Sequence, residues 1–416
     1  MIVAGIIAEY NPFHNGHKLL IDRARREFGA DYVVALMSGD FTQNGMPAIA
    51  GRHLRAEMAL YGGADVVISY PTRYATSSAE GFAENAVRIL NSLGVIDFLI
   101  FGSESGDITA LTRAAAILVS EPEEYSLRLR ELLKTGASFP KARELALAEI
   151  DPEAAALLRE PNNILGIEYI KALMRLNSGI RPVTVLREGA AYHDVAREGG
   201  NAAITGAASP ILSATAIREG FMKENITLET LEAAMPAEAL GILLNDQAEN
   251  GYMPIDDFSI LLADRIFSAH TPSELMRCDD VTTELANAIF QARYSFRSYS
   301  LFAHELKAKH ITHSHIYRAL LHIALGIEHK KYHDIAHVLG FSAEGQALIG
   351  IIRLRSRCRV ILNPGSEMKA LAPSEREFME EETRISNLYN LHRSLRSGRP
   401  MENTLSRFMV KTPPRQ

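Results

Sequence analysis

Two histidines near the start of the sequence have a spacing that could support chemistry on a phosphate group. His14 and His17 stand three residues apart in "NPFHNGH", directly after a run of apolar residues. If the turn is helical, both imidazoles share a face at a helix N-terminus, where free amides and the helix dipole favour an anion. This arrangement predicts attack at the α-phosphate of a nucleotide, with both imidazoles stabilising charge that grows in the transition state.

The spacing of the pair leaves two other interpretations open. The histidines could be half of a metal site, or two loop residues without a function. A metal requires more ligands, and no cluster of Cys, Asp or His lies nearby in the sequence. For the nucleotide interpretation, the dipole is expected to lower the pKa of His17, and a bound polyphosphate is expected to raise it again.

The elements around the pair are typical of an α/β protein. Short apolar runs without alternation predict parallel strands that are covered on both faces, at residues 2–8, 32–37, 65–70 and 96–101. Helical patterns separate these runs, at residues 15–27, 52–60 and 77–93. The alternation predicts a doubly wound parallel sheet, in which ligands bind outside the carboxyl ends of the strands.

The loop after the first predicted strand has residues suited to a ligand site. Pro12 cannot continue the ladder, and this predicts a turn in this position. Asn15 is expected to be the N-cap of the following helix, and Gly16 leaves room for a ligand close to the backbone.

The rest of the sequence predicts three regions. Helices rich in Ala, Leu and Glu follow at 107–160, then a helix opened by "PNNILGIEYIKALM", a strand at "RPVTVLRE" and a short helix opened by "SATAIREG". From about residue 225 the pattern is almost entirely helical. We therefore predict a nucleotide-binding catalytic domain at 1–222, a mainly helical domain at 223–400 and a disordered tail at 401–416.

Charge and cysteine content limit the class of protein. The formal net charge of −6 argues against a uniformly basic nucleic-acid binder. Between Ala286 and Leu362, however, eleven Lys/Arg stand against four Asp/Glu, together with eight of the fourteen histidines. This segment is either a solvated helix face or a surface that contacts phosphate backbone. Two cysteines fit a reducing cytoplasm, and no apolar run predicts a membrane span or a signal peptide.

Several sequence blocks together resemble the bacterial tRNA(Met) cytidine acetate ligases. "HNGH" resembles the HxGH signature of the adenylyltransferase and class I aminoacyl-tRNA synthetase superfamily, and "SATAIR" resembles its second signature. The longer blocks occur in the family's order: "EYNPFHNGH", "MSGDFTQNGMPAIAGRHLRAEMAL", "GADVVISYP", "FGSESGDI", "PNNILGIEYIKAL", "YHD" and "SATAIR". The match covers most of residues 1–220 and continues more thinly to about residue 360.

The resemblance implies an enzyme with ATP and acetate as co-substrates. Members of this family activate acetate as acetyl-adenylate and pass the acetyl group to N4 of the wobble cytidine of elongator tRNA(Met). Mg²⁺ is expected to arrive with ATP, since the sequence has no dedicated carboxylate cage for it. Elongator tRNA(Met) is the implied partner; no membrane partner is expected, and the oligomeric state is left open.

The resemblance also implies the site residues. The catalytic pair is His14 and His17. The ATP loop comprises Ile7, Ala8, Glu9, Tyr10, Asn11, Pro12, Phe13, His14, Asn15, Gly16, His17, Lys18, Leu19 and Leu20. Further ATP contacts are Gly102, Asn162 and Arg187, and the groups expected to hold the β- and γ-phosphates are Ser213, Thr215 and Arg218. No metal ligands are implied.

Contacts with tRNA are expected in the basic segment. The candidates are Lys307, Lys309, Arg318, Lys330 and Lys331. Aromatic residues that could stack on an anticodon base are Tyr10, Phe41 and Tyr192. The polar residues Asp40, His193 and Asp194 lie in matching blocks without an assigned role.

Two other functions compete with this interpretation. An adenylyltransferase for a small phosphorylated metabolite would share both signatures, but it would not need 200 helical residues with a basic stretch. A non-catalytic RNA-binding protein could have kept an old nucleotide-binding fold.

Overall fold

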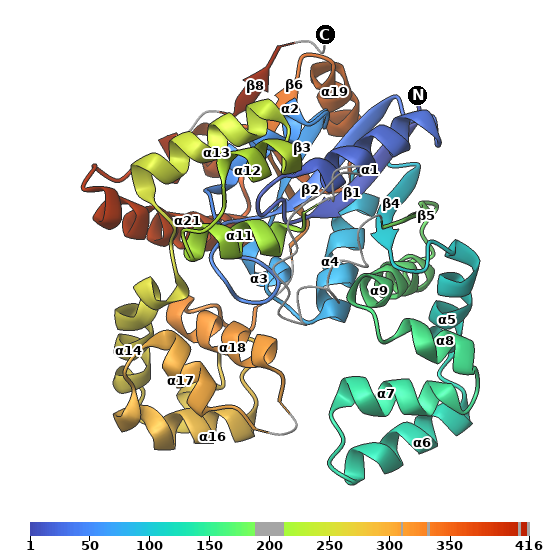
Figure 1. The fold of residues 1–416 in the computed structure, drawn as a ribbon, viewed down its shortest axis with the longest axis vertical. Helices are drawn as coiled ribbons and strands as arrows, with labels where there is room; N and C mark the ends of the chain where they lie inside the picture. Colours follow the sequence, from blue (N-terminus) through green and yellow to red (C-terminus); the bar gives the residue numbers. More distant parts are fainter. Residues whose placement is uncertain (188–211, 309–310, 331–332, 407–408, 414–416) are drawn as a thin grey trace.

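The computed structural model describes residues 1–187, 212–308, 311–330, 333–406 and 409–413, and its centre is one eight-stranded sheet (Figure 1). The strand order is β5-β4-β1-β2-β3-β6-β7, with β8 beside β6. Five neighbouring strands are parallel, as predicted: β1 (Val3–Ala8), β2 (Tyr32–Ser38), β3 (Val66–Tyr70), β4 (Phe98–Ser103) and β5 (Arg181–Leu186).

Helices connect these strands in the predicted order. Those between β1 and β4 are α1 (Asn15–Arg26), α2 (Arg52–Tyr61), α3 (Thr72–Ala75) and α4 (Ala79–Ser92). Those between β4 and β5 are α5 (Ile108–Ser120), α6 (Glu123–Lys134), α7 (Phe139–Ala148), α8 (Pro152–Leu157) and α9 (Pro161–Arg175). The helix predicted at "SATAIREG" is α11 (Ala214–Met222), and α12 (Leu228–Ala234) and α13 (Ala237–Asn250) follow it.

The sheet is covered on both faces, which explains why its strands lack alternation. Neighbouring residues of a strand point to opposite faces, so Val3 and Val34 join one core and Ala4 and Val33 join the other. The first core is completed by side chains of α4, α5 and α9, and the second by side chains of α1, α2 and α13. The prediction of a doubly wound sheet is therefore confirmed.

The sheet also takes three strands from beyond residue 330, in a part of the chain that was predicted to be mainly helical and to end in a disordered tail. β6 (Ile335–Ser342) pairs antiparallel with β3, and β7 (Arg359–Ile361) and β8 (Val410–Thr412) pair parallel with β6. The sheet is thus mixed, and the prediction of a disordered tail is wrong for residues 410–412. The predicted domain boundary between residues 222 and 223 stays a prediction, although strands from both sides of this boundary belong to the same sheet.

The helices beyond α13 form a unit with a core of its own. They are η1 (Ile255–Phe258), α14 (Ser259–Ser268), α15 (Pro272–Leu275), α16 (Thr283–Ala292), η2 (Arg293–Ser295), α17 (Tyr299–Glu305) and α18 (His313–Leu325). Phe41, from the loop after β2, is fully buried in this core together with Tyr389 of the long helix α21 (Pro373–Ser397). The loop after β2 therefore fixes the helical unit to the sheet.

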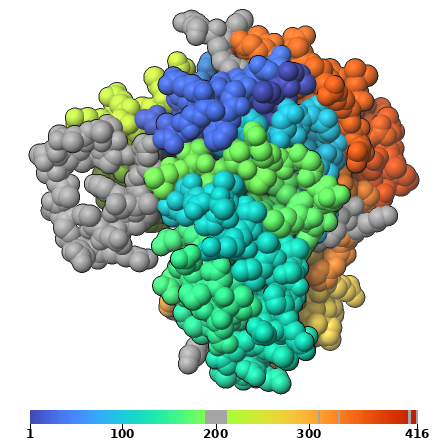
Figure 2. Space-filling model, turned by 90° about the vertical axis from the view of Figure 1, so that its right-hand side faces the viewer, coloured from blue at the N-terminus to red at the C-terminus, as the bar shows by residue number. Residues whose placement is uncertain are grey.

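Figures 1 and 2 both show a second helical lobe, made by α6 and α7, extending from the sheet at the bottom of the view. The remaining elements are α19 (Gly345–Arg355), α20 (Pro364–Glu367), η3 (Met368–Ala370) and η4 (Thr404–Ser406). Among the described residues, no helix combines the length and the apolar character that crossing a bilayer requires.

A buried arginine of α2 holds the carboxyl ends of β1 and β2. The guanidinium group of Arg55 is fully buried, and it donates hydrogen bonds to the carbonyl oxygens of Glu9, Ser38, Gly39 and Ala50. Ser38 is the last residue of β2, and the other three carbonyls lie in the loops that follow the two strands. Arg55 therefore fixes the start of the loop that contains the histidine pair.

We expect Arg55→Met to lower the free energy of unfolding by about 3–5 kcal/mol, because four buried carbonyl oxygens lose their shared donor. Urea unfolding of the two proteins measures the difference. Arg26→Met, at the exposed end of α1, is the control and should change the free energy by about 0.5 kcal/mol or less. A loss below about 1 kcal/mol in Arg55→Met would show that Arg55 does not hold the loops.

Candidate active site

The two histidines cap the helix that follows β1. Nδ1 of His14 accepts a hydrogen bond from the backbone N–H of Gly16 at 3.0 Å, and Nδ1 of His17 accepts one from the backbone N–H of His14 at 3.2 Å. His14, with extended backbone angles, is the N-cap of α1. The prediction that Asn15 is the N-cap is wrong: Asn15 is the first helical residue, and its side-chain amide donates to the carbonyl oxygen of Ala233.

These hydrogen bonds determine the tautomer of both rings. An imidazole nitrogen that accepts from an N–H carries no proton, so each neutral ring carries its proton on Nε2. The ring centroids lie 3.9 Å apart, which confirms that His14 and His17 share a face. The pair can therefore donate two neighbouring Nε2–H groups to a ligand.

Burial and neighbouring cations keep the pair neutral. Burial, followed by the positive charges of Arg187 and Arg218, lowers the pKa of His14 to about 4. Burial, followed by His14 and Arg187, lowers the pKa of His17 well below its usual value. The predicted direction for His17 is right, but burial and these charges cause the shift. An anion between the arginines and the rings would oppose it.

Aromatic packing holds the backbone of the loop. Phe13 is fully buried, and a Cβ on Gly62 would lie 2.1 Å from its ring, so only glycine fits at that position. The ring of Tyr10 packs edge-on against His17 with centroids 4.8 Å apart. Because Tyr10 and Phe41 are buried, the prediction that they stack on an anticodon base is wrong. Tyr192 lies outside the described residues.

The second signature lies against the first. Nη1 of Arg218 donates to the carbonyl oxygen of Asn11 at 2.6 Å, and Nη2 donates to Oγ1 of Thr215 at 3.0 Å. The hydroxyl of Ser213 accepts from the N–H of Ala216 and caps α11. The structure thus brings together the loop after β1 and the helix of "SATAIR", which are 200 residues apart in the sequence.

A third group of predicted residues meets at the end of β4. Nη1 of Arg187 donates to Oδ1 of Asn162 at 3.2 Å, and a Cβ on Gly102 would lie 3.0 Å from Cγ of Arg187. Sequence reasoning missed Glu104, which accepts from the side chain of Asn162 and from the backbone N–H of Asn163. Glu104 therefore caps α9 and orients Asn162. Its position in "FGSE", just after a predicted strand, could have indicated a residue of the site.

The other residues of the predicted ATP loop differ in burial and in their polar partners. Ile7 and Ala8 end β1 and are half-buried, and the carboxylate of Glu9 accepts from the backbone N–H of Gln43 at 2.8 Å. Pro12 is buried in the turn. Lys18 pairs with Asp22 at 3.1 Å on α1, and two residues of that helix, Leu19 and Leu20, follow it. Their contact with a nucleotide stays a prediction.

Asp40, which had no predicted role, is structural. Its Oδ1 accepts from the N–H of Arg52 at 2.8 Å and so caps α2, whose N-cap Gly51 has no side chain to do this. Its Oδ2 accepts from the hydroxyl of Ser386 on α21. His193 and Asp194 lie outside the described residues.

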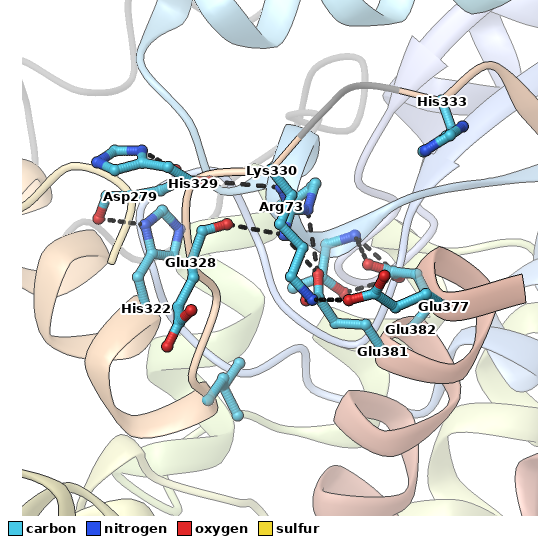
Figure 3. Close-up of polar contacts among 12 residues, drawn as sticks. Arg73, Asp279, His322, Glu328, His329, Lys330, His333, Glu377, Glu381 and Glu382 are labelled. Carbon is cyan, nitrogen blue, oxygen red and sulfur yellow. Dashed lines mark hydrogen bonds and ion pairs between the residues drawn. The ribbon is translucent and has the colours of Figure 1, made fainter. Parts of the chain in front are cut away.

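The predicted tRNA contacts are mostly engaged within the protein. Nζ of Lys330 forms ion pairs with Glu377 at 2.8 Å and Glu381 at 3.3 Å, in a network that also contains Arg73 (Figure 3). Arg318 is buried and pairs with Asp280 at 2.6 Å, which contradicts the expectation of an exposed contact.

Lys307 donates to the carbonyl oxygens of Ala308 and Ile311 from an exposed position, and Lys309 and Lys331 lie outside the described residues. Among the residues that the structure describes, no group of three or more His, Cys, Asp or Glu side chains could hold a metal ion.

Comparisons with known proteins identify the family of the chain. A family model described as HIGH Nucleotidyl Transferase matches residues 1–403. The tRNA(Met) cytidine acetate ligase of Thermoanaerobacter sp. (strain X514) is 36% identical over 399 residues, covering 94% of this chain and 95% of the relative. That of Acetivibrio thermocellus (strain ATCC 27405) is 36% identical over 403 residues, covering 94% of both.

Solved structures from Thermotoga maritima extend the likeness over both whole chains. The crystal structure of TmcAL bound with alpha-thio ATP is 29% identical, with a TM-score of 0.86, and covers 100% of each chain. The apo form I has a TM-score of 0.89 at the same identity and coverage. The chain therefore belongs to the HIGH nucleotidyltransferase family and, within it, to the tRNA(Met) cytidine acetate ligases.

Proposed function

We propose that the protein is an ATP-dependent ligase that acetylates N4 of the wobble cytidine of elongator tRNA(Met). The observation that carries this proposal is the meeting of His14, His17, Arg187 and Arg218 at the carboxyl end of β1, in a chain similar to a protein crystallised with an ATP analogue. Two neutral donors and two cations at one edge of the sheet suit a polyphosphate.

The first step would activate acetate. A carboxylate oxygen of acetate attacks the α-phosphorus of ATP, the bond to the bridging oxygen of the β-phosphate breaks, and pyrophosphate leaves. The Nε2–H groups of His14 and His17 would donate to the oxygens on which negative charge grows. Because both rings are already neutral and capped by the backbone, they need no reorganisation when this charge forms.

The arginines would have a different role. Arg218 reaches the loop of the histidine pair and also Thr215, so its fork is fixed between the two signatures. A fixed guanidinium near the β- and γ-phosphates would hold pyrophosphate as it departs. Arg187 is held by Asn162 on the other side and would act on the nucleotide from the end of β4.

The second step would demand less of the protein. N4 of the cytidine attacks the carbonyl carbon of acetyl-adenylate, AMP leaves, and the amine loses a proton. The mixed anhydride is already reactive, so positioning of the base accounts for much of the rate. Mg²⁺ would accompany ATP as part of the substrate.

A metabolite adenylyltransferase would use the same phosphate-binding residues, so the test of the proposal has to distinguish the two reactions. Mass spectrometry of elongator tRNA(Met) incubated with the protein, ATP and labelled acetate tests the proposal. We expect one labelled acetyl group on the wobble cytidine. ATP–pyrophosphate exchange that ignores acetate and requires a phosphorylated metabolite would instead favour the adenylyltransferase.

Substitution of either histidine should remove one transition-state donor. We expect His14→Ala and His17→Ala each to slow acetate-dependent ATP–pyrophosphate exchange about 10²- to 10³-fold, while tRNA binding is largely kept. Unchanged exchange in the double variant would contradict the assignment of the active site.

Two amide substitutions at His17 distinguish the role of Nδ1 from the role of Nε2. An asparagine amide can take the position of Nδ1 and a glutamine amide the position of Nε2. If donation from Nε2 carries the rate, His17→Gln should keep more exchange activity than His17→Asn. The reverse order would mean that capping of α1, rather than donation to the substrate, explains the need for His17.

The protonation of the pair can be followed by NMR titration of the imidazole signals. Without nucleotide, His14 should stay neutral until the pH falls towards about 4, because burial and the two arginines oppose its charged form. Because the unfolded chain binds this proton nearer the usual value of 6.5, stability is expected to fall as the pH drops below about 6.5. Bound ATP should raise the pKa. Titration of His14 near 6.5 without nucleotide would contradict the buried, capped arrangement.

A further inference from the structure

Four arginines at the end of α19 are not used by the proposed chemistry. Arg353, Arg355, Arg357 and Arg359 occupy every second position across the end of α19 and the start of β7, and all four are exposed. Within the described part of the chain, their guanidinium groups form no hydrogen bond or ion pair. The sequence left open whether the basic residues of the segment 286–362 form a solvated face or a surface that contacts phosphate. At these four arginines the positive charge is not neutralised by an ion pair within the described part of the chain. We call these four residues the arginine strip.

The backbone of the strip is fixed. The N–H of Arg357 donates to the carbonyl oxygen of Ser92 at 2.7 Å, and a Cβ on Gly94 would lie 2.7 Å from the carbonyl oxygen of Arg355. The contacts are made with the last residue of α4, Ser92, and with the turn that follows it. The guanidinium groups thus extend from a held backbone, which reduces the entropy that a ligand has to overcome.

Three of the arginines surround one hollow. Arg353, Arg357 and Arg359 line a surface hollow of about 400 Å³, together with Ser356 and Glu375. Glu375 is the carboxylate among the lining residues, and it already accepts from the backbone N–H of Ala372. Three like charges around one hollow repel each other unless an anion lies between them.

We infer that the arginine strip binds the phosphate backbone of the RNA substrate. This inference rests on the proposed function, and it names a tRNA contact outside the predicted set of lysines. Arginine forks match phosphate oxygens in pairs. The fourth arginine, Arg355, does not line the hollow, but it is exposed and adds a further positive charge to the same end of α19.

The position of the strip allows contact with a large ligand. Figure 1 places α19 at the upper edge of the molecule, and orange atoms of this part of the chain lie at the surface in Figure 2. β7 begins beside Ile335 of β6, and β6 pairs with β3. The strip is thus joined through the sheet to the strands that hold the candidate active site.

The experiment compares two variants of equal charge. The test variant replaces all four strip arginines by glutamine (R353Q/R355Q/R357Q/R359Q). The control replaces four exposed cations elsewhere (R26Q/R130Q/K134Q/R181Q). Binding of tRNA(Met) is measured by fluorescence anisotropy over a series of KCl concentrations, and acetylation is measured at varied tRNA concentration.

We expect the test variant to bind tRNA at least tenfold more weakly and its salt slope to fall by about 3, since each phosphate contact contributes about 0.7–0.9. KM for tRNA should rise, while kcat and acetate-dependent ATP–pyrophosphate exchange stay the same. The four corresponding lysine substitutions should keep the salt slope with an intermediate affinity, and they serve if the glutamine variant fails to fold.

Equal weakening in test and control variants, or an unchanged salt slope in the test variant, would overturn the inference. Two other results would also overturn the inference. If the test variant loses binding of inorganic phosphate but keeps binding of tRNA, the strip is a small-anion site. If the test variant loses only binding of an acidic protein, the strip is a protein contact. Acetylation of tRNA by the unmodified protein tests the proposed function separately. If acetylation occurs and tRNA binding ignores the strip, only this inference fails.

Discussion

The candidate site depends on two hydrogen bonds from backbone amides to imidazole nitrogens. In most helices the first amides are satisfied by a Ser, Thr, Asp or Asn side chain or by water. Here His14 and His17 satisfy them, and this places the protons of both rings on the opposite side. One arrangement therefore stabilises the start of α1 and prepares two donors for a ligand. A side chain that only capped the helix could not do both.

The surroundings of the pair are built to keep that arrangement. Arg55 holds the ends of β1 and β2 through carbonyl oxygens, and Asp40 joins the start of α2 to α21. Arg187 opposes protonation of both rings, and Arg218 opposes protonation of His14. The guanidinium groups of Arg187 and Arg218 donate to neutral groups, the side chains of Asn162 and Thr215 and the carbonyl oxygen of Asn11.

Much of the parallel sheet and the pairing of the two signatures could be predicted from the sequence. Continuous apolar runs indicate strands covered on both faces, and short polar turns mark their ends. The role of Arg55 could not be predicted, because an arginine on a helix normally reaches solvent and its burial here is decided by distant carbonyls. The same applies to Arg318 and Lys330, whose partners Asp280 and Glu377 come from other elements. Pairing of β6 with β3 also left no local signal, since it joins segments far apart in the chain.

The order of strands in the sheet has a consequence for how the protein forms during translation. The edge of the sheet beyond β3 is completed by residues 335–342, 359–361 and 410–412, which leave the ribosome long after β1–β5. Until then the open side of β3 presents an unpaired backbone edge. The helical unit that emerges in between is also incomplete at this stage, because Tyr389 of α21 belongs to its core. The nascent chain therefore spends a long interval with an incomplete sheet, a period in which a holding chaperone would protect it.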